Sequence, residues 1–462
     1  MQPPAPDTRP RTEFRELWKF AFPITLAHIG QSMMGFVDTA VLARAGTTML
    51  AASALSNALL ILVLSFGAGL MVGPDPLISQ AFGAGDAARA RGLVWQGGYV
   101  AAGAGTLLGL LVMGGAWLTP LLGLGSTEQA AVQDYLLWRA PGLPLMLLFI
   151  NTATYLQASE RPGVLVVSTV AANVLNLAAD VVLVFGGAEL PAFFGPLRAV
   201  PAMGAAGAAL STTFCTGLQW LIVTLALRRV PVPEGMPSRR PSRQDIQQIL
   251  RMGFPLGLQC VADEGFHGLS ALLARGLGPE SIAAHQIAMS LCIFSFMISM
   301  GIGNAAGVRV GWAVGAGDRA LARLRGQVAF VSVGVFMLCS GVIFALFPHT
   351  LARLIGTPSE VLPVLLPLLL VAALFQLSDG ALAVGGGVLR GFGETRFTFY
   401  ANTVGHYLVG LPVALLLAYG LGYGVLGIWW GLFAGLTTIA AALLWRFERL
   451  SSGSLQPLAA QA

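Results

Sequence analysis

Residues 83–91 read GAGDAARAR and residues 315–323 read GAGDRALAR, so seven of nine positions are identical at a separation of 232 residues. A second match has the same separation, because the pair Phe-Pro at 22–23 recurs at 254–255, each time shortly after a basic residue. Two distant matches that share one separation indicate an internal repeat. We therefore expect two copies of one architecture in this chain.

The composition identifies the environment of these copies. Of 462 residues, 56% are hydrophobic and only 10% are charged, and the mean hydropathy is +0.76. About a quarter of an average soluble domain is charged, so this composition excludes a soluble globular protein and also a disordered or collagen-like chain. Apolar runs of about 20 residues match the ~30 Å hydrocarbon layer at 1.5 Å per helical residue. The sequence predicts an all-α membrane protein.

Twelve transmembrane helices are predicted from the apolar runs between polar or turn-rich breaks. They lie near residues 17–43, 53–81, 92–119, 133–157, 164–186, 204–228, 248–276, 282–313, 326–352, 361–390, 397–419 and 424–446. Each repeat then holds six helices, an even number, so both repeats have the same orientation. This is a parallel repeat of two six-helix bundles, related by an axis along the membrane normal, with a cleft between them.

The polar segments give the predicted domain boundaries. Residues 1–16 form an N-terminal tail, residues 17–228 the first bundle, and residues 248–446 the second bundle, followed by a tail at 447–462. The intervening segment 229–247, RVPVPEGMPSRRPSRQDIQ, carries four Pro and four Arg without helical periodicity. We expect this segment to be a linker between the bundles.

The basic residues predict the orientation. If the N-terminus is cytoplasmic, 21 of the 26 Lys and Arg residues fall on the cytoplasmic side. Short cytoplasmic loops carry the excess of Lys and Arg in membrane proteins. We therefore expect a multi-pass protein of the inner (plasma) membrane with both termini and the linker in the cytoplasm.

Six segments together resemble the multidrug and toxic compound extrusion (MATE) family of ion-coupled exporters. They are specific through their order and spacing, and they cover nearly the whole chain. The segments are GFVDTAVLARAG (35–46), LISQAFGAGDAARAR (77–91), NVLNLAADVVLVFG (173–186), AAHQIAMSL (283–291), VLRGFGETR (388–396) and GLPVALLL (410–417).

The resemblance implies a V-shaped arrangement of the two bundles and an antiporter that exports amphipathic or cationic organic compounds by alternating access. The coupling ion would be H+ or Na+, and no other cofactor, metal or catalytic residue is expected. Small organic substrates and membrane lipids are the expected partners, without nucleic acid, and the chain is expected to act as a monomer and not as an enzyme.

Acidic residues within the first bundle mark a candidate ion site, since each costs ~2.5–3.5 kcal/mol to insert at membrane depth. Asp38 lies roughly 20 residues into its predicted helix and Asp180 roughly 16 into its own, so both can lie roughly 24–30 Å from the inner edge. Asn176 is four residues before Asp180 and shares its helix face. In the archaeal-type branch these three positions form a cation site, and Thr212 would add a hydroxyl. H+ and Na+ both remain open there, as does a purely structural hydrogen-bond network.

The second bundle carries different acids. Asp263, Glu264 and Asp379 resemble the acidic site of the NorM-like branch, although that branch has a single Glu where this chain has adjacent Asp and Glu. Adjacent helical residues point about 100° apart, so one of the two is expected to face the cavity. Their mutual repulsion favours protonation of one carboxylate. His267, four residues after Asp263, could pair with either acid.

Two further groups are predicted from residue type and position. Pro23 and Pro255 lie inside helices, delete a backbone donor and are candidate hinges. Adaptable apolar and amide side chains could line the substrate cleft, although such residues also occur in helix cores. The cleft candidates are Gln31, Met33, Met34, Gln259, Phe266 and His267.

Two rival functions are weighed against export. A flippase of lipid-linked precursors from the same superfamily would need a strongly cationic cavity for pyrophosphate, whereas the candidate residues here are acidic. An intramembrane enzyme would need a catalytic constellation such as HExxH, which the sequence lacks. The four cysteines lie in apolar runs and are expected to be small core residues: Cys215, Cys260, Cys292 and Cys339.

The orientation yields a labelling prediction. In a variant without native cysteines, Ser238→Cys in the linker should react with an impermeant thiol reagent only after the cells are permeabilised. Ser126→Cys, in a predicted outer loop, should react in intact cells. Labelling of Ser238→Cys from outside would invert the topology.

Overall fold

The structure is a computed structural model that describes residues 9–188, 192–231, 239–453 and 458. The remaining residues include parts of the two predicted tails and the middle of the predicted linker, and those parts of the predictions lie outside the described residues.

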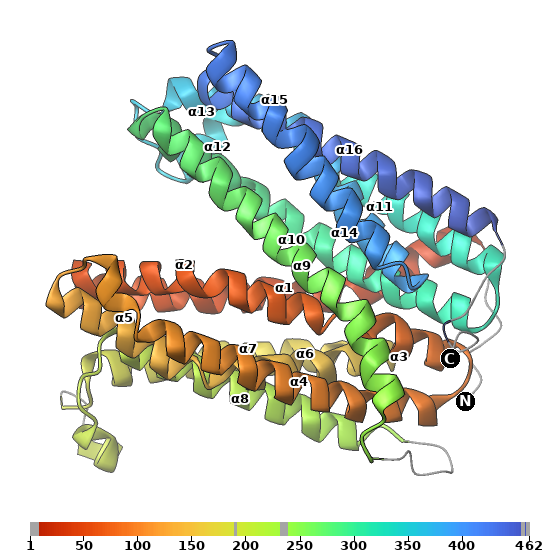
Figure 1. Cartoon of the computed structure of the whole chain (residues 1–462), viewed down its shortest axis with the longest axis horizontal. Coiled ribbons are helices and arrows are strands. Elements are labelled where there is room, and N and C mark those ends of the chain that lie inside the picture. Colours follow the sequence, from red (N-terminus) through yellow and green to blue (C-terminus); the bar gives the residue numbers. More distant parts are fainter. Residues whose placement is uncertain (1–8, 189–191, 232–238, 454–457, 459–462) are drawn as a thin grey trace. The chain divides into compact units, whose positions relative to one another are not determined.

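The first half of the chain is helical throughout its described spans, which Figure 1 shows from red to yellow-green. Its elements are α1 (Pro10–Ala45), α2 (Thr47–Leu70), α3 (Pro74–Gly83), α4 (Ala87–Ala116), η1 (Thr119–Leu122), α5 (Ser126–Arg139), α6 (Gly142–Ala158), α7 (Gly163–Phe185), η2 (Ala192–Ala199) and α8 (Ala205–Arg228).

The second half continues from green to blue in Figure 1. Its elements are α9 (Arg243–Gly276), α10 (Pro279–Gly315), α11 (Arg319–Leu346), α12 (Pro348–Leu354), α13 (Leu362–Gly391), α14 (Arg396–Thr403), η3 (Val404–Gly410), α15 (Leu411–Leu415), η4 (Leu416–Gly420) and α16 (Gly424–Ser452). The segments η3 and η4 are π-helical.

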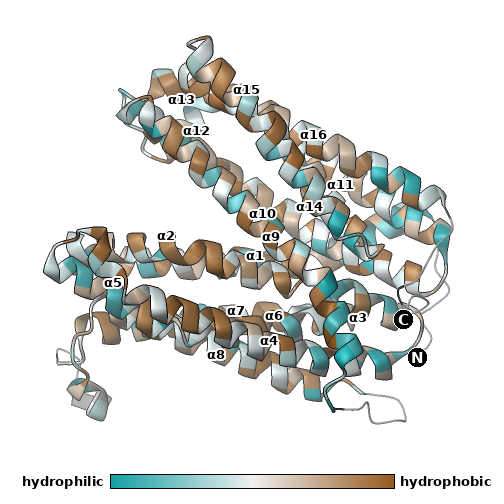
Figure 2. Cartoon of the chain, in the orientation of Figure 1, coloured by the Kyte–Doolittle hydropathy of each residue, from teal (hydrophilic) through white to brown (hydrophobic). Residues whose placement is uncertain are grey.

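Membrane crossing is supported by the length and composition of these helices. In the described part of the chain, eleven helical segments are long and apolar enough to span a bilayer. Hydrophobic residues occupy most of the length of these helices, and hydrophilic residues lie mainly toward the helix ends (Figure 2). The twelfth predicted span is α9, which is long enough at 34 residues but carries Asp263, Glu264 and His267 along its length. The helix with the weakest membrane signal is therefore one that carries candidate site residues.

Several helices extend beyond their predicted limits. α1 begins at Pro10 and not near 17, α16 ends at Ser452 and not near 446, and α9 begins at Arg243 and not at 248. The early start of α9 has a local cause, because the Ser242 hydroxyl accepts a hydrogen bond from the Asp245 backbone N–H at 3.3 Å. A serine that caps the first turn in this way stabilises a helix start in polar sequence.

The chain divides into two compact units that do not coincide with the predicted bundles in every segment. The C unit contains Met1–Thr25, Asp75–Asp86 and Leu258–Ala462, and the N unit contains Leu26–Pro74 and Ala87–Gly257. The divisions within α1 and α9 each fall two residues after a helix-interior proline, Pro23 or Pro255, and are 232 residues apart. The hinge role of the prolines stays a prediction.

Within the C unit, α10 and α13 pack through paired glycines. A Cβ on Gly387 would lie 2.0 Å from the carbonyl oxygen of Gly303, and one on Gly391 would lie 2.6 Å from that of Gly307. Glycines four residues apart on both helices let membrane helices approach closely. This contact fixes the register of α13, the helix that carries Asp379.

A buried ion-pair network joins three helices at one end of the C unit. Glu13 of α1 accepts hydrogen bonds from Arg309 of α10 and from Arg325 of α11, the latter at 3.4 Å. Arg319, at the start of α11, donates to the Ser451 carbonyl near the end of α16 at 2.9 Å. The start of α1 and the end of α16 therefore lie on the same side, as an even number of crossings requires.

The N unit contains the equivalent pair. Asp245, 232 residues after Glu13, accepts two hydrogen bonds from Arg89 of α4 at 2.9 and 2.5 Å. α4 directly follows the first GAGD sequence, and α11 directly follows the second. In each repeat, the acidic residue near the start of the first helix therefore binds an arginine of the helix that follows the GAGD sequence of the other repeat. The two repeats therefore share this carboxylate–arginine pair as well as their helices.

Removal of the Glu13 charge should destabilise the protein. The Glu13 and Arg309 side chains are only 7% and 8% exposed, so Glu13→Gln leaves two arginines without their carboxylate. Breaking a buried pair in this way typically costs about 3–5 kcal/mol.

Glu16→Gln is the matched control, because Glu16 faces Lys19 at 4.0 Å with both side chains exposed. Unfolding of both variants in detergent would measure the difference. Equal stability of the two would show that the Glu13 network does not hold the fold.

Candidate functional site

The predicted ion-site residues of the first repeat lie together inside the N unit. Asp38 comes from α1, Asn176 and Asp180 from one face of α7, and Thr212 from α8. All four are buried, and Asn176 and Asp180 have no exposed surface at all. We call these four residues the N cluster.

Short polar contacts connect the N cluster. The Thr212 hydroxyl donates to Asp38 Oδ2 at 2.7 Å, and the Asn176 amide donates to Asp180 Oδ1 at 3.4 Å. The same amide reaches the Ser211 hydroxyl on α8 at 3.1 Å. The carboxyl groups of Asp38 and Asp180 also interact electrostatically with each other. Two neighbouring carboxyl groups are stable together when a proton or another cation lies between them.

Three oxygens of the N cluster have no hydrogen-bond partner. They are Asp38 Oδ1, Asn176 Oδ1 and Asp180 Oδ2, all of them buried. Buried polar atoms are normally paired, so unpaired acceptors on three side chains of one cluster require an explanation. Oxygen acceptors of this kind fit a proton or a hard cation such as Na+. No group of three or more His, Cys, Asp or Glu side chains that could hold a metal ion occurs among the described residues, so amide and hydroxyl oxygens would have to contribute.

A second layer of residues beside the N cluster was missed from the sequence. Arg139 and Tyr135 of α5 both interact electrostatically with Asp38, and the Tyr135 hydroxyl donates to Asn57 Oδ1 of α2 at 3.2 Å. The sequence analysis did not single out Arg139. The sequence does mark this position, because Arg139 is a charged residue immediately before Ala140-Pro141, the short connection between α5 and α6.

The acids of the second repeat lie inside the C unit. Asp263 and Glu264 lie on α9, and the Asp263 side chain remains 29% exposed. Its Oδ1 atom is buried 3.6 Å from Nε2 of His406 on η3 and has no hydrogen-bond partner. The neighbouring Tyr407 hydroxyl donates to the Ala262 carbonyl at 2.8 Å. The histidine beside Asp263 is thus His406, and the pairing of His267, which helix spacing predicts, stays a prediction.

Asp379 is separate from these carboxylates. It is buried on α13, and it interacts electrostatically with Cys292 of α10. The structure therefore does not bring the three predicted acids of the second repeat into one contact. Gln376, one turn before Asp379, is completely buried with both amide atoms unpaired, and sequence reasoning missed it although it lies in an otherwise apolar run.

The predicted substrate-cleft residues divide into two groups. Met33 is 48% exposed, and Gln31 is exposed and accepts a hydrogen bond from Gln219 at 3.1 Å. Met34 and Phe266 are instead buried in hydrophobic cores, Met34 against Ala172 and Cys215. Successive helical residues point to different faces, and these two face inward, so their place in a substrate-lining surface stays a prediction.

Gln259 and His267 are partly buried on α9, and Gln259 interacts with Asp263 one turn later.

The cysteines also differ from their expected place in one case. Cys215 and Cys292 are buried and Cys260 is partly buried, but Cys339 is exposed on α11. An exposed side chain on a membrane-spanning helix contacts lipid tails, which are as apolar as a protein core. A small apolar residue such as cysteine therefore does not need to be buried there.

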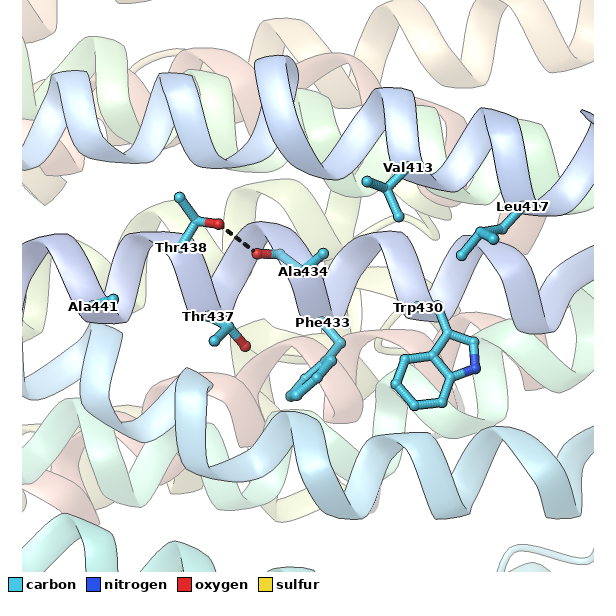
Figure 3. Close-up of a pocket in the computed structure, with 8 residues that line it drawn as sticks. All are labelled: Val413, Leu417, Trp430, Phe433, Ala434, Thr437, Thr438 and Ala441. Carbon is cyan, nitrogen blue, oxygen red and sulfur yellow. Dashed lines mark hydrogen bonds between the residues drawn. The ribbon is translucent and has the colours of Figure 1, made fainter.

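A pocket of about 580 Å³ lies between α16 and the α15–η4 segment in the C unit. Figure 3 shows Trp430 and Phe433 of α16 on one side, and Val413 and Leu417 opposite them. The Thr438 hydroxyl donates to the Ala434 carbonyl and is already satisfied. The pocket is therefore apolar and contains none of the candidate acids.

The chain matches the MatE family model twice, over residues 23–182 and 256–416, which agrees with the internal repeat. A protein of Bradyrhizobium diazoefficiens named "Probable multidrug resistance protein NorM" is 34% identical over 455 residues, which is 95% of this chain and 94% of that protein. A protein of the same name from Deinococcus radiodurans is 32% identical over 457 residues, 96% of this chain and 97% of that protein.

Solved structures have the same fold at lower sequence identity. A Vibrio cholerae MATE transporter crystallised in a bent form has a TM-score of 0.83 at 19% identity, over 95% of this chain and 97% of its own. A eukaryotic MATE transporter has a TM-score of 0.80 at 22% identity, over 95% and 96%.

The contact between Thr212 and Asp38 should contribute to stability. Thr212→Val removes the hydroxyl and leaves Asp38 Oδ2 without that donor, which we expect to cost about 1–2 kcal/mol. Thr216→Val is the control one turn away, because the buried Thr216 hydroxyl bonds only the Thr212 backbone carbonyl. Equilibrium unfolding of the purified variants would compare them, and equal losses would argue against a specific Thr212–Asp38 contribution.

Proposed function

The chain belongs to the multidrug and toxic compound extrusion (MATE) family of membrane transporters, and from this premise we propose that it exports amphipathic or cationic organic compounds in exchange for an inward-moving cation. The relatives named as multidrug resistance proteins cover almost the whole chain and support this substrate class.

The observation that carries the proposal is the N cluster with its three unpaired buried oxygens. A structural network would be expected to use these acceptors internally, whereas an ion site leaves them for a ligand. The cluster also joins α1, α7 and α8, so occupancy by a cation changes the attraction among three helices.

The coupling ion is proposed to be H+. The electrostatic interaction of Asp38 with Asp180 is compatible with one shared proton, and loss of that proton leaves two repelling carboxylates. Repulsion of this kind favours a different local arrangement, and a ligand drives transport only if it binds the two arrangements unequally. Na+ on the unpaired oxygens is the alternative ion.

A flippase of lipid-linked pyrophosphate precursors is less well supported. The N cluster and the second repeat's α9 both carry carboxylates, which would repel a pyrophosphate group rather than bind it. The proposed orientation has both termini in the cytoplasm, supported by the shared side of the α1 start and the α16 end and by the distribution of Lys and Arg.

Asp38→Asn should abolish ion-driven export while the protein still folds. Asn has nearly the shape of Asp but cannot bind and release a proton, so the transport cycle stops in the state that resembles protonated Asp38. Asp134→Asn, on the exposed face of α5, is the control and should transport normally. Ethidium transport in proteoliposomes would be measured under a pH gradient and, separately, a Na+ gradient.

Transport by the wild type under the Na+ gradient but not under the pH gradient would exclude H+ as the coupling ion. If Asp38→Asn retains wild-type transport, the N cluster is structural. If the wild type moves no ethidium under either gradient, the proposed function itself is wrong.

A further inference from the structure

We propose that His406 is the proton-responsive partner of Asp263: neutral His406 leaves the carboxylate free to bind the cationic group of a substrate, and protonated His406 occupies the carboxylate and releases the substrate. This inference rests on the proposed function and assigns His406 a part in the exchange of a proton for an organic cation.

The position of His406 is fixed by an unusual backbone. It lies in the π-helical segment η3, which widens the helix and redirects side chains compared with an α-helix. A Cβ on Gly405 would lie 2.2 Å from Ile439 of α16, and the Gly435 carbonyl oxygen is 2.9 Å from the same point. The backbone of η3 is therefore pressed against α16, and this contact holds His406 on the side of α9.

The His406–Asp263 pair connects a buried group with an accessible one. The His406 side chain is 4% exposed and that of Asp263 is 29% exposed, with 3.6 Å between Nε2 and Oδ1. This separation is too long for a good hydrogen bond but short enough for an ion pair once the imidazole carries a proton. Asp263 Oδ1 has no hydrogen-bond partner. We expect this of a carboxylate whose neighbouring histidine is neutral.

An aromatic ring lies beside the imidazole of His406. Phe266 lies 4.5 Å away, centroid to centroid, with 32° between the ring planes. An aromatic face stabilises a cation at this distance. The Tyr407 hydroxyl, bonded to the Ala262 carbonyl, ties η3 to the turn of α9 that carries Asp263.

The other titratable groups around the pair come from three elements. Glu264 and His267 lie on α9, His285 lies on α10, and Tyr407 lies on η3 itself. His267 interacts electrostatically with both His406 and His285. A second positive charge on these histidines would be repelled, so the cluster takes up one proton at a time, and one proton on His406 replaces one positive charge of a substrate at Asp263.

The sign of the pH dependence follows from this exchange. At high pH His406 is neutral and Asp263 attracts a cation, so binding is strong. At low pH the histidine proton competes for the same carboxylate, so binding is weak. An uncharged amphiphile does not use the carboxylate and should bind independently of His406.

The test is equilibrium binding of tetraphenylphosphonium to the full chain in lipid nanodiscs at pH 8 and pH 5.5. For the wild type we expect the affinity to fall at least about fivefold at the lower pH, the lower end of typical coupling between ligands. His406→Gln should retain binding at pH 8 and show less than about a twofold change between the two pH values, since its side chain has no proton to gain. His349→Gln, at an exposed position on α12, should behave as the wild type. The uncharged dye N-phenyl-1-naphthylamine should bind all three proteins equally at both pH values.

Asp263→Asn provides a second test that does not depend on how His406→Gln folds. It should bind tetraphenylphosphonium at pH 8 as weakly as the wild type does at pH 5.5, with no further loss on acidification. Wild-type pH dependence in either His406→Gln or Asp263→Asn would overturn the inference and leave the proposed function intact. Failure of the wild type to bind tetraphenylphosphonium at either pH would instead count against the proposed function.

Discussion

The structure depends on one constraint: within a bilayer, polar groups find their partners inside the protein because the lipid offers none. Helices satisfy the backbone, and many buried side chains are satisfied by neighbouring helices, as Thr213 is by the Trp138 carbonyl at 2.9 Å and Arg309 is by Glu13. Against this background the unpaired oxygens of Asp38, Asn176 and Asp180 are informative. A site for a transported ion is a place where this pairing is left incomplete.

The two repeats share a scaffold but differ in chemistry. Glu13 and Asp245 occupy equivalent positions and both bind arginine. The position equivalent to Asp38 is Ser270, whose buried hydroxyl bonds the Phe266 carbonyl of its own helix at 2.9 Å. A side chain satisfied within its own helix leaves nothing for an ion. The two repeats have therefore diverged in their buried polar residues. The N unit contains the N cluster, whereas the C unit contains a carboxylate beside histidines.

Close backbone contacts explain how polar residues can be positioned so firmly. α10 and α13 approach through Gly303 and Gly387, and η3 approaches α16 through Gly405 and Gly435. Such contacts bring carbonyl groups and side chains of neighbouring helices within direct range and restrict rotation of each helix about its axis. The directions of Asp379 and His406 are consequences of this packing, and the π-helical form of η3 adds an offset that a regular helical period does not predict.

The sequence by itself determined the membrane environment, the order of the twelve helices and the repeat, because run length and composition are local properties fixed by bilayer thickness. Helix depth also placed Asp38 and Asp180 at one level, the i,i+4 spacing placed Asn176 on the helix face of Asp180, and the family resemblance predicted their grouping into a site with Thr212.

Only the tertiary structure decided which side chains face each other across helices. It buried Met34 and Phe266, separated Asp379 from Asp263, and placed Arg139 and His406 beside the acids. The physical reason is that the rotation of a helix about its axis is set by packing against its neighbours, so a residue's depth can be read along the chain but its partners cannot.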